Sequence, residues 1–300
     1  MNILITGGTG FIGQELRETF LKEGHNLVIV TRSPKKYEDE AASNQRFISW
    51  EDDLIVEMEH CDVVINLAGE NIFGQRWNEE VKKRIYESRI NATRSLVSAM
   101  EKAENRPSVF ISASASGIYG DRGDTILTED AKPADDFLAE VCVDWEAESQ
   151  KAAEFGVRVV NPRIGIVFEE GGGALEKMIP PFKFFVGGPI GDGKQYMSWI
   201  HRTDLVKTLI FPIEIEELTG AYNVCSPNPA TMNEVSETLG EVMNRPSFFR
   251  VPKFALDIAF GEAAQPITGS IRMQPKKLQI YDFEFRFEEL EEALADITGN

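Results

Sequence analysis

Three glycines near the start of the chain have the spacing of a nucleotide-binding turn. Gly7, Gly10 and Gly13 form the pattern G-x-x-G-x-x-G, between an apolar run at residues 3–5 and residues with helical spacing. The first glycine permits a tight bend, the second lets a pyrophosphate approach the backbone, and the third lets the helix pack on the strand. Free N–H groups at the helix start face the phosphates. The pattern predicts a dinucleotide site. The other loop residues that we expect at the cofactor are Thr9, Phe11 and Ile12.

A P-loop is the main alternative for this segment, besides a glycine turn without a ligand. Gly8 and Gly13 have the spacing of the outer P-loop glycines. Gln14 and Glu15, however, stand where a lysine and a serine or threonine are needed. No side chain there can reach a γ-phosphate or hold Mg²⁺, so we reject this alternative.

Cations follow the second expected strand, at residues 26–30. Thr31 and Arg32 come directly after it, and Lys35 and Lys36 lie nearby. An NAD-binding unit usually carries an acid here to hold the ribose 2′-hydroxyl, whereas a cation suits a 2′-phosphate. The sequence therefore predicts NADP rather than NAD, with an ordinary basic loop as the alternative.

Small residues follow the expected strand at residues 62–66. They leave room for a flat ring or a ribose beside the backbone, at the edge of the sheet where ligands collect. We expect these residues along the cofactor: Leu67, Ala68 and Gly69.

Hydroxyl groups follow the next expected strand, at residues 108–112. Ser114 lies in this cluster and could hydrogen-bond a substrate carbonyl, although a serine-rich turn that satisfies its own backbone is the alternative. Serine hydrolysis is not indicated, because the glycine that precedes the serine in a G-x-S-x-G elbow is missing.

Strands and helices must alternate to position these residues. Expected helices at 77–102 and 137–155 separate the strands, so we predict an α/β fold with a Rossmann-type, doubly wound parallel sheet and a smaller α+β C-terminal substrate lobe. We divide the chain into an NADP-binding domain at 1–168 with return elements from 195–225, a substrate lobe at 169–249, and an appended helical unit at 250–300. The last unit has helical patterns at 253–260 and 287–297.

The net charge of −18 predicts repulsion from nucleic acid and from anionic membranes. No apolar run approaches the ~20 residues of a membrane span. We see no signal peptide, and three scattered cysteines and three isolated histidines favour neither disulfides nor a metal site. We therefore expect a cytoplasmic protein with a small-molecule substrate and no metal, nucleic-acid or membrane partner. A homodimer is the assembly we consider.

Several motifs together resemble a known family, the extended short-chain dehydrogenase/reductase superfamily. They resemble most its atypical subgroup of "epimerase family proteins", whose C-terminal domain of unknown function resembles the last fifty residues. The matching segments are 7–13, 66–71 (NLAGEN), 171–175 (GGGAL), 187–193 (GGPIGDG), 199–201 (WIH) and 261–262. The resemblance implies a Rossmann fold and an NADP-type cofactor. It implies polar cofactor contacts from Arg84 and Arg89, and places Arg163 near the nicotinamide.

The sequence departs from the superfamily at its catalytic pair. The Tyr-x-x-x-Lys motif is absent from residues 130–160, and alignment on Glu146 puts Leu138 and Cys142 in its place. Ser114 matches the catalytic serine. The proton donor is unassigned, with Tyr119 as the first candidate, although its sequence context resembles that of a structural tyrosine.

A second departure concerns the arginine with which sugar-nucleotide epimerases grip a diphosphate. Met197 stands at that position. We predict an NADP-binding oxidoreductase or epimerase-like enzyme of unknown substrate. The alternatives are a non-catalytic NADP-binding sensor or scaffold and, third, a nucleotide-sugar epimerase. Cys142 and His201 are the further candidates for the proton donor, and both are more commonly packed residues.

Overall fold

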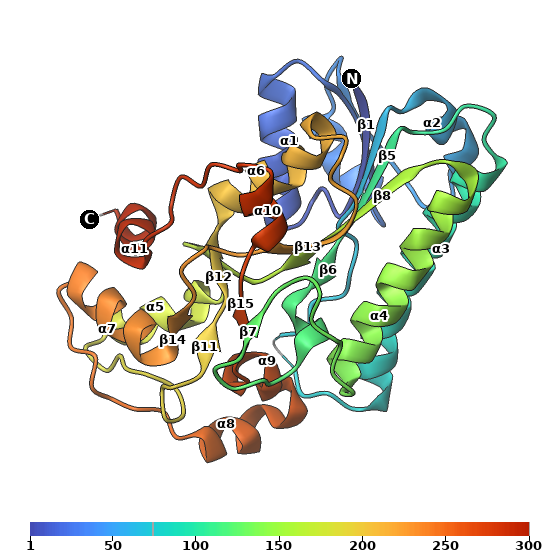
Figure 1. Ribbon diagram of the computed structural model, residues 1–300. Coiled ribbons are helices and arrows are strands. Elements are labelled where there is room, and N and C mark those ends of the chain that lie inside the picture. The colour runs from blue at the N-terminus through green and yellow to red at the C-terminus, as the bar shows by residue number, and fades with distance from the viewer. Residues whose placement is uncertain (74, 300) are drawn as a thin grey trace.

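The centre of the computed structural model, which describes residues 1–73 and 75–299, is a parallel sheet (Figure 1). Its strand order is β13-β8-β5-β4-β1-β2-β3, and β6 also pairs with β8. The direction of winding reverses between β1 and β4, which is where ligands bind in open α/β sheets. The strands are β1 (Asn2–Thr6), β2 (Asn26–Val30), β3 (Gln45–Ile48), β4 (Val63–Asn66), β5 (Val109–Ser112), β6 (Ser114–Ala115), β8 (Arg158–Ile164) and β13 (Gly220–Val224).

Helices cover both faces of the sheet, because its central strands are apolar on both sides. Ile3 and Ile5 of β1 pack toward α1 (Phe11–Lys22) and α6 (Arg202–Glu214), whereas Leu4 faces α2 (Leu54–His60) and α3 (Glu79–Lys102). Beside α3 lies α4 (Phe137–Gln150), as Figure 1 shows. The predicted doubly wound fold is confirmed.

Caps explain where three helices begin. Asp53, Asn78 and Asp136 each accept a hydrogen bond from a backbone N–H in the first turn of α2, α3 and α4. The structure therefore starts α3 at Glu79, later than the expected 77. Further short helical turns are η1 (Pro34–Glu40), η2 (Ser116–Tyr119) and η3 (Lys151–Phe155), and η3 takes over the end of the helix expected at 137–155.

A smaller lobe packs beside the sheet around Phe168, Trp199 and Leu239. Its helices are α5 (Leu175–Lys183) and α7 (Met232–Val242), and Thr231 and Glu234 form a capping box at the start of α7. Its strands are β9 (Ile166–Glu169), β10 (Gly172–Gly173), β11 (Tyr196–Met197), β12 (Trp199–His201) and β14 (Ala230–Thr231).

The last fifty residues spread over the rest of the molecule. Leu278 enters the core of the large sheet, Leu294 enters the core of the smaller lobe, and β15 (Arg272–Met273) pairs with β7 (Ile126–Leu127). The division at 168 and 249 stays a prediction. The helices here are α8 (Lys253–Phe260), η4 (Gly261–Ala264), α9 (Gln265–Thr268), α10 (Lys276–Ile280) and α11 (Leu290–Thr298).

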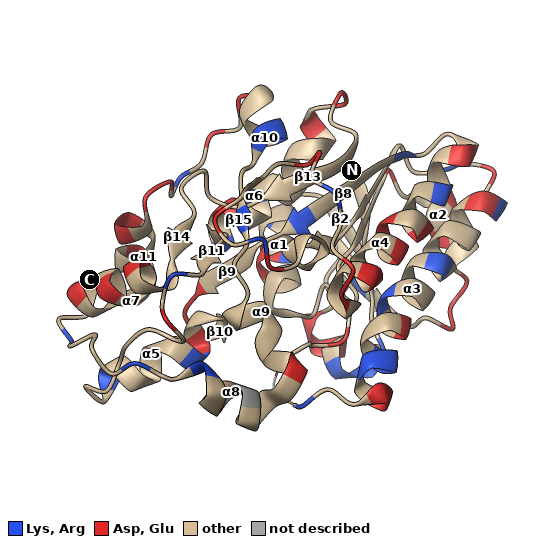
Figure 2. Ribbon diagram, turned by 60° about the horizontal axis from the view of Figure 1, so that its bottom comes forward, with Lys and Arg blue, Asp and Glu red and all other residues tan. Residues whose placement is uncertain are grey.

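Acidic residues are spread over the outer helices and loops of the molecule (Figure 2). Within residues 1–73 and 75–299, none of the helices has both the length and the apolar character to cross a membrane.

Candidate functional site

The glycine turn between β1 and α1 has a geometry that only glycine permits. Gly7 has a φ of +70°, and a Cβ there would lie 2.6 Å from the Leu67 carbonyl oxygen. A Cβ on Gly13 would lie 2.4 Å from the Gly7 oxygen. Gly10 precedes the helix, and its first turn has no side-chain cap and no acid in the part of the chain that is described. The N–H groups of this turn are therefore open to an anion.

A short hairpin lies against the start of α1. Thr9, Phe11 and Ile12 are half-buried, and a Cβ on Gly172 would overlap the Phe11 ring. The Arg202 guanidinium lies over the Phe11 ring, 5.1 Å from the ring centre, and pairs with Glu169 at 3.2 Å. The sequence did not indicate where residues 171–173 lie in the fold. Glycine is required at position 172 because a side chain there would overlap the Phe11 ring.

The end of β2 presents exposed positive charge. Arg32 is exposed, and among the described residues neither it nor Lys35 or Lys36 forms an ion pair. Thr31 is half-buried, and its hydroxyl accepts a hydrogen bond from the Ser33 N–H at 3.5 Å.

Arg17 of α1 adds a charge that the sequence analysis missed. It is 7% exposed, and its Nη2 donates to Glu40 at 2.7 Å, whereas its Nε and Nη1 have no partner in the described residues. Its guanidinium lies 5.2 Å from the Phe47 ring, and its Cδ is next to Gly8. Leu16 and Phe20 of α1 are buried, as expected of apolar residues at helical spacing. The same spacing does not predict that Arg17, a cation between them, is buried as well.

Arg89 and Arg84 hold the loop that follows β4. Arg89 donates to the backbone oxygens of Ile85 and Glu70 at 2.9 and 3.1 Å and packs on Gly69 and the Trp145 ring. Burial lowers the pKa of Arg89. Arg84 pairs with Glu80 at 3.2 Å. Both side chains therefore have protein partners, and their predicted contact with a cofactor stays a prediction. The Leu67 and Ala68 backbone lies against Gly7.

Five polar side chains form one connected network at the ends of β6 and β8. Ser114 Oγ donates to Glu146 Oε1 at 2.6 Å, and Arg163 donates to both Glu146 oxygens at 2.8 and 2.9 Å. Arg163 also donates to the Tyr119 hydroxyl at 2.9 Å, which itself donates to Asn223 Oδ1 at 2.6 Å. Glu146 is therefore held between a cation and a serine hydroxyl.

The candidate proton donors are enclosed by this packing. Tyr119 is fully buried, its hydroxyl is engaged at both ends, and burial raises its pKa to about 12. Burial also raises the pKa of the Cys142 thiol to about 11. His201 caps α6, because its Nδ1 accepts from the Thr203 N–H at 3.1 Å. This arrangement does not favour the predicted catalytic role of Tyr119.

A known family matches most of the chain. The NAD dependent epimerase/dehydratase family matches residues 3–225, and a domain of unknown function (DUF1731) matches residues 251–297. The chain belongs to the NAD dependent epimerase/dehydratase family. The resemblance drawn from the motifs is thereby confirmed.

Relatives in this epimerase/dehydratase family span the whole chain. Epimerase family protein YfhF of Bacillus subtilis is 40% identical over 304 residues, which are 100% of this chain and 99% of that protein. The chloroplastic SDR39U1 homolog of Arabidopsis thaliana is 37% identical, over 99% of this chain and 86% of that protein. The chain is thus similar to proteins that share both of its matched regions.

Solved structures agree with the fold. Human epimerase family protein SDR39U1 (isoform2), solved with NADPH, has a TM-score of 0.90 at 31% identity, with 100% of both chains covered. MoeE5 in complex with UDP-glucose and NAD has a TM-score of 0.79 at 21% identity, with 100% of this chain and 98% of that chain covered. The second likeness concerns the fold alone. These two proteins hold different nicotinamide cofactors.

At the two positions where the superfamily has the Tyr and Lys of Tyr-x-x-x-Lys, this chain has a hydrocarbon side chain and a thiol. Leu138 and Cys142 lie on the α4 face next to η2: Leu138 Cβ contacts Gly117, and Cys142 Sγ donates to the Ala115 oxygen at 3.8 Å. Met197 is 3% exposed and belongs to the core of the smaller lobe. No group of three or more His, Cys, Asp or Glu side chains within residues 1–73 and 75–299 could hold a metal ion.

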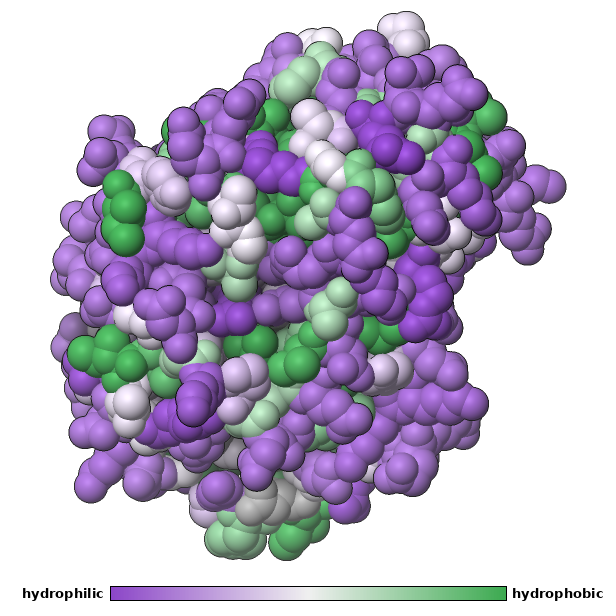
Figure 3. Space-filling model, turned by 45° about the vertical axis from the view of Figure 1, so that its right-hand side comes forward, coloured by the Kyte–Doolittle hydropathy of each residue, from purple (hydrophilic) through white to green (hydrophobic). Residues whose placement is uncertain are grey.

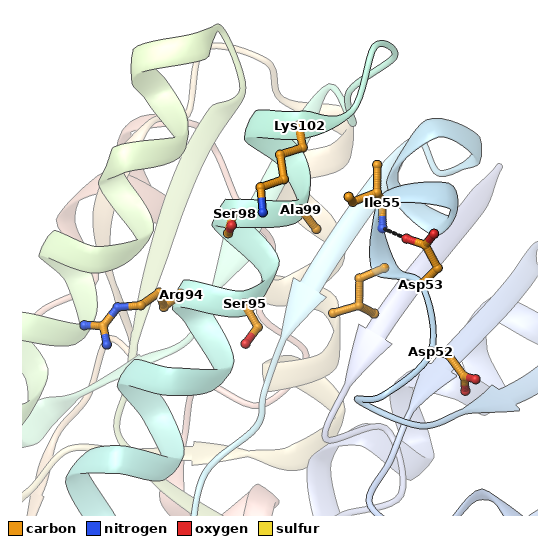
Figure 4. A pocket seen from close by; sticks show the side chains of 9 residues that line it. Asp52, Asp53, Ile55, Arg94, Ser95, Ser98, Ala99 and Lys102 are labelled. Carbon is orange, nitrogen blue, oxygen red and sulfur yellow. Dashed lines mark hydrogen bonds between the residues drawn. The ribbon is translucent and has the colours of Figure 1, made fainter.

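Two pockets differ in their relation to these residues. A small pocket beside Ser116 has a volume of about 20 Å³, room for one water, and is lined by polar and apolar residues of β9, β11, α9 and the segment around residue 271. A larger, open pocket of about 430 Å³ lies between α2 and α3 (Figure 4) and shares none of the predicted site residues. The predicted site residues therefore do not line the larger of these two pockets. The larger one is lined by Asp52, Asp53, Leu54, Ile55, Arg94, Ser95, Ser98, Ala99 and Lys102.

Proposed function

We propose that the protein is an NADP-dependent oxidoreductase that acts on a small carbonyl or alcohol substrate. The observation that carries the proposal is the open first turn of α1, with the exposed Arg32 at the end of the neighbouring strand β2. This combination suits a pyrophosphate together with a 2′-phosphate. The human relative solved with NADPH supports the same choice.

The residues that would hold the cofactor surround the ends of β1, β2 and β4. The backbone N–H groups after Gly10 would face the pyrophosphate, Arg32 would hold the 2′-phosphate, and Arg17, with two unused N–H groups, adds positive charge close by. Leu67 and Ala68 would lie along the nicotinamide half. When bound, the cofactor supplies or accepts the hydride.

Ser114 is the residue that we propose to contact the reacting oxygen. Its hydroxyl already donates to Glu146, so Ser114 can accept a proton from a substrate alcohol while it passes its own proton to the carboxylate. Arg163 holds the Glu146 carboxylate in position with two hydrogen bonds. Ser114 and Glu146 would thus move one proton without a tyrosine.

The surroundings of this serine favour a compact substrate over a nucleotide sugar. Met197 offers no charge to a diphosphate, and the pocket beside the neighbouring Ser116 is small. A cytoplasmic location and a homodimer stay predictions, and the Arabidopsis relative is named as chloroplastic.

A non-catalytic NADP sensor is the second candidate, and the enclosure of three side chains favours it. Tyr119, Cys142 and His201 are all buried and hydrogen-bonded to protein groups. A protein that binds NADP but lacks an accessible acid could report the cofactor's redox state without turnover.

Replacement of Arg32 tests the cofactor choice. We expect Arg32→Ala to weaken NADPH binding by roughly 10- to 100-fold, the value of a charge-assisted contact, and to leave NADH binding unchanged. Fluorescence titration of both nucleotides measures the effect. Lys22→Ala, an exposed change at the far end of α1, is the matched control. Equal losses for NADPH and NADH would contradict the 2′-phosphate contact.

Replacement of Ser114 separates the enzyme from the sensor. We expect the purified protein to oxidise NADPH with at least one member of a panel of small aldehydes and ketones, and Ser114→Ala to lower the rate roughly 100-fold or more. Absorbance of NADPH records turnover, and the titration above shows that the variant still binds it. Tight binding without turnover on any carbonyl supports the sensor instead.

A further inference from the structure

An exposed apolar edge lies on the smaller lobe and on α8 of the C-terminal segment. Nine of the fifteen exposed large hydrophobic side chains in the described residues belong to three segments, 184–186, 248–251 and 254–260. We call these segments the aromatic edge. Phe184 is 77% exposed, Phe248 is 71% and Ile258 is 71%. Such a concentration on one part of a surface marks an interaction site.

Backbone contacts join the first two segments. Gly187 pairs with Ser247, Ile190 pairs with Val251, and the Phe249 N–H donates to the Gly187 oxygen at 3.1 Å. The third segment is α8, which follows directly and projects at the lower end of the molecule in Figure 1. In Figure 3 hydrophobic residues occupy the surface at that lower end. The aromatic edge is therefore continuous.

The charge around the aromatic edge is opposite to that of the molecule. Residues 177–191 and 243–260 contain five Lys and Arg and one Asp, in a chain whose net charge is −18. Arg245 stacks over the Phe185 ring at 4.5 Å, and Arg250 donates to the Gly191 oxygen. Neither of these two arginines pairs with a described acidic side chain. Their charge is available to an anionic partner.

We propose that the aromatic edge binds the surface of an anionic lipid membrane. Exposed phenylalanine and isoleucine side chains fit between acyl chains, with lysine and arginine at the headgroups. A protein partner would need a separate complementary pocket for each exposed phenylalanine ring. A two-fold dimer through this edge would bring like charges together. The overall negative charge keeps the remaining surface away from the bilayer, so the edge sets the orientation.

Vesicle co-sedimentation of the full chain tests the proposal. We expect binding to vesicles of equal parts phosphatidylcholine and phosphatidylglycerol, much weaker binding to phosphatidylcholine alone, and loss of binding as salt rises. Phe184→Ser with Phe248→Ser should lower binding more than roughly tenfold through lost apolar burial. Arg250→Glu with Lys253→Glu should lower it on anionic vesicles.

Controls distinguish this surface from the fold and from the nucleotide site. Ile280→Ser, at a 62% exposed position on α10, should bind vesicles as the parent does. The NADPH affinity of every variant should be unchanged, which keeps the test separate from the proposed function. If the double variant does not fold, the single variant Phe184→Ser replaces it. Absence of binding to anionic vesicles overturns the proposal. A second result would also overturn it. The Phe184→Ser and Phe248→Ser double variant would still bind vesicles, but would lose either a concentration-dependent dimer or the binding of an acidic polypeptide that the parent shows.

Discussion

Arg163 connects two parts of the site that come from distant segments. Its guanidinium donates twice to Glu146 and once to Tyr119, and the side chain is 9% exposed. Burial acts to lower the pKa of Arg163, but the hydrogen bonds and charge of Glu146 raise it overall. The Arg163 guanidinium therefore stays charged at every physiological pH and holds both oxygens of Glu146 next to Ser114.

Replacement of Arg163 should destabilise the protein through the charge that it leaves behind. We expect Arg163→Met to cost about 3–5 kcal/mol of the free energy of unfolding, because Glu146 loses its buried partner. Urea denaturation measures the change. Combining Arg163→Met with Glu146→Gln should restore part of the stability. An unchanged midpoint in the single variant would show that water replaces the guanidinium without cost.

Local sequence predicts the glycine turn but not the polar network. The conformation of Gly7 and the close approach at Gly13 follow from a short segment, so residue type and spacing are sufficient to identify them. Tyr119, by contrast, bonds a residue 104 positions away. Nothing in the residues around Tyr119 indicates that its hydroxyl is occupied, so the sequence left it as a candidate donor.

At the scale of the element, the N-terminus of α6 depends on a titratable side chain. His201 accepts the Thr203 N–H through Nδ1, and its ring lies 4.1 Å from that of Phe287. Burial lowers the pKa of His201, although Asp296 opposes the shift. Only the neutral imidazole can accept at Nδ1, so protonation removes the cap.

His201 should make stability depend on mildly acidic pH. Its folded pKa lies below the unfolded value of about 6.5, so its contribution is present above that pH and is lost as the pH falls through the folded pKa. We expect His201→Asn, which keeps a capping oxygen, to flatten the dependence of urea midpoints between about pH 5 and 8. His60→Asn, on the exposed end of α2, is the control. Parallel curves for parent and His201→Asn would contradict this role.

Long elements were predictable and short ones were not. The strands at 26–30 and 62–66 carry continuous apolar runs, which a buried parallel strand requires. The two-residue strands β7, β10 and β15 are too short to show a period. β7 and β15 are far apart in the sequence and pair with each other, whereas β10 pairs with the preceding strand β9.

At the scale of the whole molecule, the last fifty residues take part in several cores. Leu278 packs under the large sheet, Met273 beside Tyr119, and Leu294 against Phe168 and Trp199. The sequence showed helical patterns at 253–260 and 287–297 but not where they pack, because amphipathicity does not identify the partner.

Shared cores should make unfolding a single transition. We expect Leu294→Ala, at a fully buried site, to cost about 2–5 kcal/mol and to lower the tryptophan-fluorescence and circular-dichroism midpoints together. Ile280→Ala, on the exposed side of α10, should leave both unchanged. Separate midpoints by the two probes would show that the C-terminal segment unfolds as an independent unit.

Because β15 pairs with β7, residues that are synthesised late complete a part of the fold that earlier residues begin. The glycine turn leaves the ribosome among the earliest residues, whereas Ile267 and Ile271, which line the pocket beside Ser116, leave among the latest. The glycine turn can therefore form well before the residues of this pocket are present, and a nucleotide bound at that stage would stabilise the growing polypeptide.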